Sequence, residues 1–174
     1  MKEPKHPGMG KEFPRTDLIL SLSAVLFFLI WILDSFILRL SGRFTDFVPD
    51  IVRIALFGGL EISAIILGLH SHESLFGKKK VDFNLITDGA FAYVRHPLYL
   101  SILLTYLGFV FGSMSLVSLI PWICYVILFD KMATYEEKNL VRIFGDAYIE
   151  YQKKVPKWFP RGRPKKQRTN VNMS

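Results

Sequence analysis

Three long apolar blocks interrupt an otherwise polar chain of 174 residues. Residues 18–38 and 51–69 are almost entirely apolar, and residues 97–129 form a run of 33 residues without a charged side chain. A helix needs about 20 apolar residues to cross a bilayer, so each of the first two blocks predicts one membrane span. At about 1.5 Å per residue the third block would form a helix of about 50 Å, which is too long for a single crossing.

The third block is predicted to fold as a tight helical hairpin. Residues 112–115, with the sequence Gly-Ser-Met-Ser, interrupt the apolar run and leave spans near 97–112 and 115–133. Pro121 lies inside the second span, where a proline removes a backbone hydrogen bond, and we expect it to kink the helix. The predicted fold class is therefore all-α: a multi-pass integral membrane helical protein with about four spans, including this C-terminal hairpin.

Polar segments flank the predicted membrane domain, which covers residues 17–160. Residues 1–16 contain three prolines and predict an N-terminal tail. Residues 131–159 carry apolar side chains at helical spacing that is broken by Gly145, which predicts a cytoplasmic extension of the last span, a bend and a short amphipathic helix. Residues 161–174 are basic and lack apolar periodicity, which predicts a disordered tail attracted to anionic lipid headgroups.

The distribution of basic residues predicts the orientation in the membrane. Nineteen of the 22 Lys and Arg residues lie in the N-terminal tail, in the loop between the second and third blocks, or after residue 129. With four spans these regions share one side, and the positive-inside rule places them and both termini in the cytoplasm. The net charge of +7 therefore reflects topology, and no folded basic face with interleaved aromatic residues predicts nucleic-acid binding.

Composition narrows the class of protein further. Hydrophobic residues make up 51% of the chain and charged residues 21%, which argues against a disordered chain or a water-soluble globule. The single cysteine, Cys124, excludes a disulfide framework and a Cys-x-x-Cys zinc site. His70 and His72 are of metal-ligand type, but at a helix end they more often lie at the surface, so no metal site is predicted.

Four residues inside the apolar blocks carry structural expectations. A charged side chain in mid-membrane is costly, so Glu61 should face protein or water, as a packed structural group or in the lining of an acceptor cavity. Asp34 lies nearer a membrane end and is expected to contact water. Gly58 and Gly59 are expected to permit close helix packing.

Two polar clusters flank the hairpin and are candidates for chemistry. The first, residues 89–99, places Arg95 and His96 directly before Pro97, a residue suited to the first turn of a helix. The second, residues 135–151, contains the adjacent pair Glu136 and Glu137 among aromatic side chains. A cation, a carboxylate pair and aromatic rings at one hairpin mouth would suit a zwitterionic or cationic ligand. A membrane-interface anchor and a solvated helical face are the alternative interpretations of the two clusters.

These clusters resemble the isoprenylcysteine carboxyl methyltransferase family and its relatives, the membrane phospholipid methyltransferases. The resemblance covers about residues 85–160, which it marks as the cofactor-binding part. It rests on two motifs: Gly89-x-Phe91-x-x-x-Arg95-His96-Pro97-x-Tyr99, and Glu136-Glu137-x-x-Leu140-x-x-x-Phe144-Gly145-x-x-Tyr148-x-x-Tyr151.

The resemblance implies an S-adenosylmethionine-dependent methyltransferase that takes a lipophilic acceptor from the membrane. The implied acceptor is a prenylated cysteine carboxylate, with a phospholipid amine or a thiol as further possibilities. Glu136 or Glu137 would bind the ammonium group of the cofactor, and Arg95 would bind its carboxylate. His96 would donate a hydrogen bond to this amino-acid end. Tyr148 or Tyr151 would pack on the adenine. The implied catalytic residues are Arg95, His96 and Glu137, and the implied cofactor-binding residues are Gly89, Phe91, Arg95, His96, Pro97, Tyr99, Glu136, Glu137, Tyr148 and Tyr151.

Two rival functions remain at this point. A nicotinamide-dependent sterol-type reductase would share the hairpin and the Arg-His-Pro triplet, although Leu98 and the Glu pair depart from that pattern. A non-enzymatic membrane adaptor could keep the fold without a cofactor. A soluble Rossmann-type methyltransferase is excluded, because no Gly-x-Gly-x-x-Gly follows a strand. Residues 69–80 match the family poorly, so the acceptor remains open.

Overall fold

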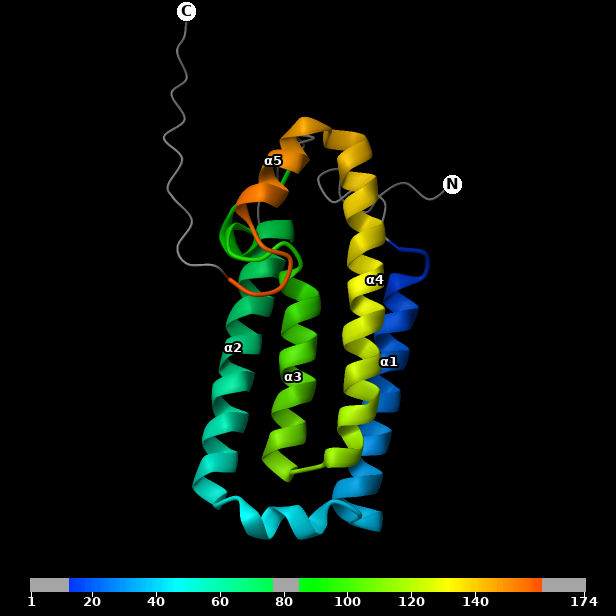
Figure 1. The fold of residues 1–174 in the computed structure, drawn as a ribbon, viewed down its shortest axis with the longest axis vertical. Coiled ribbons are helices and arrows are strands. Elements are labelled where there is room, and N and C mark those ends of the chain that lie inside the picture. Colours follow the sequence, from blue (N-terminus) through cyan, green and yellow to red (C-terminus); the bar gives the residue numbers. More distant parts are fainter. Residues whose placement is uncertain (1–12, 77–84, 161–174) are drawn as a thin grey trace, which may run out of the picture.

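The structure is a computed structural model that describes residues 13–76 and 85–160, without the side chains of residues 43 and 44 (Figure 1). The predicted basic tail 161–174, most of the predicted N-terminal tail and the Lys78–Lys80 run lie outside the described residues. Five α-helices and four short helical turns make up the described part, which contains no strand: α1 Thr16–Ile32, η1 Leu33–Leu38, η2 Gly42–Phe47, α2 Asp50–Phe76, η3 Gly89–Ala92, α3 Pro97–Ser113, η4 Leu116–Ser118, α4 Leu119–Phe144 and α5 Asp146–Lys154.

Four apolar helices stand side by side as a bundle, as the hydrophobic pattern predicts (Figure 1). Thr16–Leu38, Asp50–Leu75 and Leu116–Phe144 are long and apolar enough to cross a membrane. The remaining apolar helix, α3, has 17 residues and rises about 26 Å, which is near the lower limit for a span. The protein is therefore an all-helical integral membrane protein.

The outer surface of the bundle is apolar. Large hydrophobic side chains on α1, α2 and α4 are more than half exposed, among them Val25, Ile62, Ile66, Leu69, Ile120 and Ile127. So broad an apolar surface is rare on water-soluble monomers, whereas lipid chains solvate it without penalty. The backbone groups of these segments bond within their own helices, as a lipid environment requires.

The hairpin between α3 and α4 turns at the predicted position. Met114 follows α3 in the left-handed conformation with φ 54°, and η4 leads into α4. The expectation that Pro121 kinks the second span is wrong. Pro121 is the third residue of α4, in the first turn, where a backbone N–H has no partner within the helix and its absence removes no hydrogen bond.

The closest helix contact is between α2 and α3, which run antiparallel. A β-carbon on Gly108 would lie 2.5 Å from the Glu61 carboxyl oxygen, and one on Gly112 would meet the Phe57 ring at 3.1 Å. Glu61 therefore faces protein, as expected. The expectation for Gly58 and Gly59 is wrong, since a β-carbon at either position would meet no atom within 4 Å.

Asp34 is buried at the end of the bundle where α1 meets the hairpin turn, with 2% of the residue exposed. Its carboxylate accepts hydrogen bonds from the Ser41 backbone N–H at 3.0 Å, the Ser41 hydroxyl at 2.7 Å and the Ser115 hydroxyl at 2.6 Å. The expectation that water solvates Asp34 is therefore wrong. The Ser41 N–H and the hydroxyls of Ser41 and Ser115 take the place of water, and the bond from the distant Ser115 ties this end of the first span to the hairpin.

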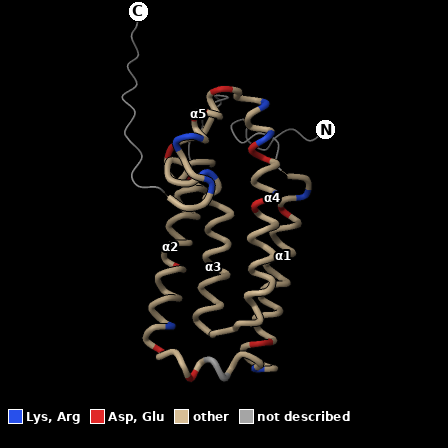
Figure 2. Tube along the Cα trace, viewed as in Figure 1, with Lys and Arg blue, Asp and Glu red and all other residues tan. Residues whose placement is uncertain are grey.

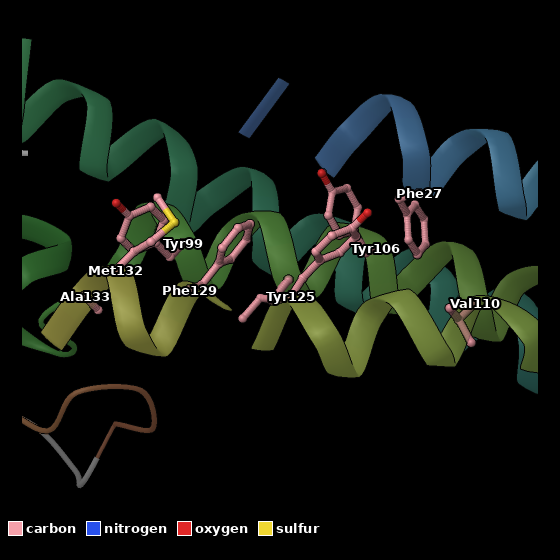
Figure 3. Packing of buried hydrophobic residues seen from close by; sticks show 9 residues of the cluster. Phe27, Tyr99, Tyr106, Val110, Tyr125, Phe129, Met132 and Ala133 are labelled. Atoms are coloured by element: carbon pink, nitrogen blue, oxygen red, sulfur yellow. The ribbon is translucent and has the colours of Figure 1, made fainter. Parts of the chain in front are cut away.

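Aromatic side chains form the core between α1, α3 and α4 (Figure 3). Phe27 stacks on Tyr106 with ring centroids 4.3 Å apart, and Tyr106 is followed by Tyr125, Phe129 and Tyr99 at centroid distances of 5.8, 6.1 and 5.4 Å. The buried residues Tyr99, Leu103, Tyr106 and Val110 recur at helical spacing on one face of α3. This series of rings leads from the bundle interior to the end where α3 begins.

Gly145 ends α4 and turns the chain back toward the bundle. Its φ of 54° is a conformation that glycine adopts without strain, and α5 begins at the next residue. The predicted bend and short helix are confirmed. Figure 1 shows α5 folded over the start of α3, and Figure 2 shows charged residues gathered at that same end of the bundle.

Candidate functional site

The two sequence motifs meet at the end of the bundle where α3 begins and α4 extends past it. Arg95 and His96 directly precede α3, with Pro97 as its first residue. Glu136 and Glu137 lie in the last third of α4. The turn at Gly145 brings α5 back over both segments (Figure 1).

Arg95 ties three segments together. Its Nε donates to Glu137 Oε1 at 2.8 Å and its Nη2 to Glu137 Oε2 at 3.4 Å. Its Nη1 donates to the backbone carbonyls of Gln152 at 3.0 Å and Val155 at 2.8 Å. These bonds use four of the five N–H donors of the guanidinium group.

Glu137 is the centre of this network. Besides Arg95, its carboxylate has His96 Nε2 at 3.0 Å from Oε1 and accepts a hydrogen bond from Gln152 Nε2 at 3.1 Å. Only 8% of the residue is exposed. A buried carboxylate needs such charged and polar partners, so Glu137 is held in one position and in turn holds the three side chains around it.

Glu136 has a different environment from its neighbour. It accepts a hydrogen bond of 2.5 Å from the Tyr99 hydroxyl, and its Oε2 lies 3.8 Å from His96 Nδ1. Its side chain is 15% exposed. Unlike Glu137, Glu136 lines the cavity of the site.

The cavity lies between the end of α2, the segment before α3, α4 and α5. Its volume is about 60 Å³, and its wall combines one carboxylate, one cation and an imidazole with a larger apolar and aromatic part. Six of the predicted site residues line it: Phe91, Arg95, His96, Glu136, Tyr148 and Tyr151.

The other four predicted residues lie beside the cavity and not in its wall. Glu137 and Tyr99 hold residues that line it, through the bonds described above. Gly89 has a φ of 60°, and a β-carbon there would lie 2.1 Å from the Ser74 hydroxyl oxygen, so glycine lets this loop approach α2. Pro97 is the buried first residue of α3, where it starts the helix.

Tyr148 and Tyr151 form the roof that α5 supplies. They are 1% and 7% exposed, and the Tyr151 hydroxyl donates to the Phe91 backbone carbonyl at 2.6 Å. Burial raises the pKa of both hydroxyls well above the ordinary value, and the negative charge of Glu137 raises that of Tyr148 further. Both side chains therefore stay neutral at physiological pH.

The sequence motifs did not identify every residue of the site. Gln152 lies one helical turn after Tyr148, and that spacing could have placed it on the same face of α5. Leu75, Leu85 and Ile86 also line the cavity, and no pattern in the sequence connected them with it. Leu75 belongs to the stretch that matches the family motifs poorly.

Comparison with known proteins agrees with the motifs. The family model described as phospholipid methyltransferase matches residues 54–147, which is more than half of the chain. The chain is 42% identical over 88 residues to a protein-S-isoprenylcysteine O-methyltransferase of Schizosaccharomyces pombe, covering 48% of this chain and 36% of that protein. It is 27% identical over 165 residues to a methanethiol S-methyltransferase of Pseudomonas deceptionensis, covering 88% and 62%.

A human protein-S-isoprenylcysteine O-methyltransferase is 30% identical over 91 residues, covering 48% of this chain and 30% of that protein. The chain thus spans between about a third and under two thirds of the length of these relatives. The sterol-type reductase alternative finds no support in these matches. By this family model, which covers more than half of the chain, including the first motif and the second as far as Gly145, the chain belongs to the phospholipid methyltransferase family.

Proposed function

We propose that the protein is an S-adenosylmethionine-dependent methyltransferase that modifies a lipophilic acceptor at the cytoplasmic surface of a membrane. The observation that carries this proposal is the cavity itself. Motif residues from the segment before α3 and from α4, about 40 positions apart, meet around it together with α5. The family membership and the methyltransferase names of the relatives support the same activity.

The lining of the cavity suits the chemistry of this cofactor. S-adenosylmethionine carries an ammonium group, a carboxylate, a sulfonium and an adenine. Glu136 supplies a carboxylate for the ammonium group. Phe91, Tyr148 and Tyr151 supply aromatic surfaces of the kind that attract cations and stack on flat rings. At about 60 Å³ the cavity accommodates the amino-acid end, and the rest of the cofactor would extend past its rim.

The hydrogen bonds of Arg95 refine its proposed role. A bidentate grip on the cofactor carboxylate needs two parallel N–H donors, and the network leaves Arg95 with one. Unless these hydrogen bonds rearrange, Arg95 can therefore donate at most one bond to the cofactor carboxylate. Its main role is to hold Glu137 and the chain at the end of α5 in place. His96 lines the cavity beside Glu136, and because its Nε2 is bonded to Glu137, its Nδ1 is the ring nitrogen left to contact that end of the cofactor.

The proposed mechanism relies on positioning. Bound S-adenosylmethionine supplies a methyl group that is already activated by the positive sulfur. Glu136 and His96 orient one end of the cofactor, and the apolar wall formed by Leu75, Leu85 and Leu140 excludes water. A carboxylate acceptor is ionised at neutral pH, so its methylation needs no general base, whereas a thiol acceptor must first lose its proton.

A second cavity supports a lipophilic acceptor. It has a volume of about 310 Å³ and lies between α1, α2 and α3 within the membrane-spanning part of the bundle. Its wall is mostly apolar: Leu20, Ala24, Ala64, Ile65, Ser101, Ile102, Thr105 and Tyr106. An acyl or prenyl chain would fit this lining, whereas methanethiol has no chain to occupy it.

The proposed orientation places the site and both termini in the cytoplasm. Most charged residues of the described part gather at the end of the bundle that holds the site (Figure 2). The basic residues there agree with the positive-inside rule. The tail 161–174, which we propose to bind anionic headgroups, lies outside the described residues.

Methyl transfer to defined acceptors tests this proposal. Purified protein in lipid nanodiscs would be incubated with S-adenosylmethionine labelled in its methyl group and with a farnesylated cysteine, a phosphatidylethanolamine or methanethiol. We expect label in the farnesylated cysteine, as a base-labile methyl ester. Transfer to methanethiol or the phospholipid instead would change the acceptor but keep the activity. No transfer to any acceptor, with binding of NADPH in a parallel assay, would contradict the proposal.

A further inference from the structure

The chain that follows α5 crosses the site and is fixed at both ends. We call Val155, Pro156, Lys157 and Trp158 the C-terminal strap. At its start, the Arg95 backbone N–H donates to the Pro156 carbonyl at 3.0 Å, and the Arg95 side chain donates to the Val155 carbonyl at 2.8 Å. The strap therefore begins against the residue that directly precedes His96.

The other end of the strap is held by α4. Lys157 Nζ donates to Asp130 Oδ1 at 2.5 Å, to the Asp130 carbonyl at 3.1 Å and to the Thr134 hydroxyl at 2.7 Å. These three bonds use all three donors of the ammonium group. The Lys157 side chain is 18% exposed, less than the 47% of Asp130, so the cation depends on these partners more than the carboxylate does.

Trp158 links the strap to the site. Its Nε1 donates to the same Asp130 Oδ1 at 2.9 Å. Its ring lies 5.9 Å from the His96 ring, while Tyr99 stacks near the same imidazole at 5.9 Å with an interplanar angle of 17°. His96 thus lies next to two aromatic rings and is only 7% exposed.

We infer that Asp130 is a positioning residue for the site. It holds Lys157 and Trp158, the strap then fixes the His96 ring, and the imidazole keeps its place 3.0 Å from Glu137 and in the cavity wall. The functional part of this inference rests on the proposed cofactor site, because His96 matters there only if the cavity binds S-adenosylmethionine.

Asp130 can hold the strap because Lys157 and Trp158 both donate to the same oxygen of its carboxylate, Oδ1. Removal of its charge leaves the ammonium group of Lys157, which is mostly buried, without a counter-ion and weakens the bond to the indole. The strap then loses its hold on α4, while its start stays bound to Arg95. Asp130 does not line the cavity, so it acts on cofactor binding through His96, which it reaches by way of the strap and also by the attraction between its charge and the imidazole.

The experiment compares Asp130→Asn with a matched control, Glu150→Gln. Glu150 also pairs with a lysine, Lys153, at 2.6 Å, but this pair is exposed and belongs to α5 alone. Two readouts are needed. NMR of the ligand-free protein follows the Trp158 indole N–H, assigned by its loss in Trp158→Phe, and the ring signals of His96. Equilibrium binding measures the Kd of S-adenosylmethionine.

We expect Asp130→Asn to shift both signals, to speed exchange of the indole proton at least tenfold and to raise the Kd about fivefold or more, at a temperature where the variant remains folded. Glu150→Gln should change none of these. Lys157→Met, which removes the other partner of the ion pair, should reproduce the effect and replaces Asp130→Asn if that variant does not fold.

Unchanged Trp158 and His96 signals would overturn the inference that Asp130 fixes the strap. Shifted signals with an unchanged Kd would overturn its role in positioning. If the unaltered protein binds no S-adenosylmethionine, the proposed function fails. In that case shifted signals would still establish the contact through the strap, but its link to a cofactor would be overturned.

Discussion

Glu136 and Glu137 are neighbours in the sequence, yet their side chains leave α4 about 100° apart. Glu137 turns inward, where Arg95, His96 and Gln152 surround it. Glu136 lies in the cavity wall. The sequence predicts the pair but not this division, because it does not fix how far α4 is rotated about its axis. The structure shows Glu137 bonded to three neighbouring side chains, and we propose that Glu136, in the cavity wall, is the carboxylate that meets a ligand.

The two buried tyrosines predict a dependence of stability on alkaline pH. Burial raises the pKa of Tyr148 and Tyr151 above 10.0, the ordinary value they regain on unfolding. Above that pH the unfolded state loses these protons first, so the free energy of unfolding should fall as pH rises past about 10. Thermal unfolding between pH 8 and 11 measures this.

The double variant Tyr148→Phe/Tyr151→Phe is the control for this titration. Its midpoint temperature should fall less steeply above pH 10 than that of the unaltered protein. Tyr151→Phe also leaves the Phe91 carbonyl without its donor, which should lower stability by about 1 kcal/mol at neutral pH. Equal slopes in the two proteins would contradict the assignment of the titration to these residues.

At the scale of helices and their contacts, the sequence predicted which helices and turns are present better than it predicted which helix faces pack together. The apolar blocks, the break at residues 112–115 and the bend at Gly145 were predicted because length and glycine position are local properties. The sequence did not predict which glycines permit close packing. Gly108 faces a neighbouring helix whereas Gly58 and Gly59 do not, and the sequence does not show which face of a helix meets a neighbour. Asp34 was misjudged for the same reason: Ser115, its partner, is 81 residues away.

The contact between α2 and α3 predicts that Gly108→Ala is destabilising. The added β-carbon would lie 2.5 Å from the Glu61 carboxyl oxygen, so the flexible Glu61 side chain must shift, at a cost of about 1 kcal/mol, the low end of the range for overpacking. Unfolding of the detergent-solubilised protein, followed by circular dichroism, measures the loss. Gly59→Ala is the matched control and should be neutral or slightly stabilising. A second change, Glu61→Ala, should restore much of the stability, and its failure to do so would refute the clash.

The Asp34 cluster predicts a second effect at this scale. In Asp34→Ala the hydroxyls of Ser41 and Ser115 and the Ser41 N–H lose their acceptor, so we expect a loss of about 2–3 kcal/mol. Because the cluster lies at the far end of the bundle from the cavity, the Kd of S-adenosylmethionine should change less than twofold at temperatures where the variant is folded. Unaltered thermal stability would show that the cluster does not tie α1 to the hairpin.

At the scale of the whole molecule, the class of membrane protein and the meeting of the two motifs could be predicted from the sequence. The motifs lie on either side of a hairpin, so an antiparallel pair of helices returns the chain to the same side of the membrane. The C-terminal strap could not be predicted, because the direction that the chain takes after Gly145 and the partners of Lys157 and Trp158 depend on tertiary contacts. The sequence also did not predict that Leu75 of α2 lines the cavity, because this too depends on tertiary contacts.

The central claim is that Glu136, in the wall of a cavity built by both motifs, binds the ammonium group of S-adenosylmethionine. Its most direct test is equilibrium binding of S-adenosylmethionine to the unaltered protein and to Glu136→Gln, with the melting temperature measured in parallel. We predict saturable binding whose Kd rises more than tenfold in Glu136→Gln, while the melting temperature stays the same. An equal Kd in both proteins would contradict the claim.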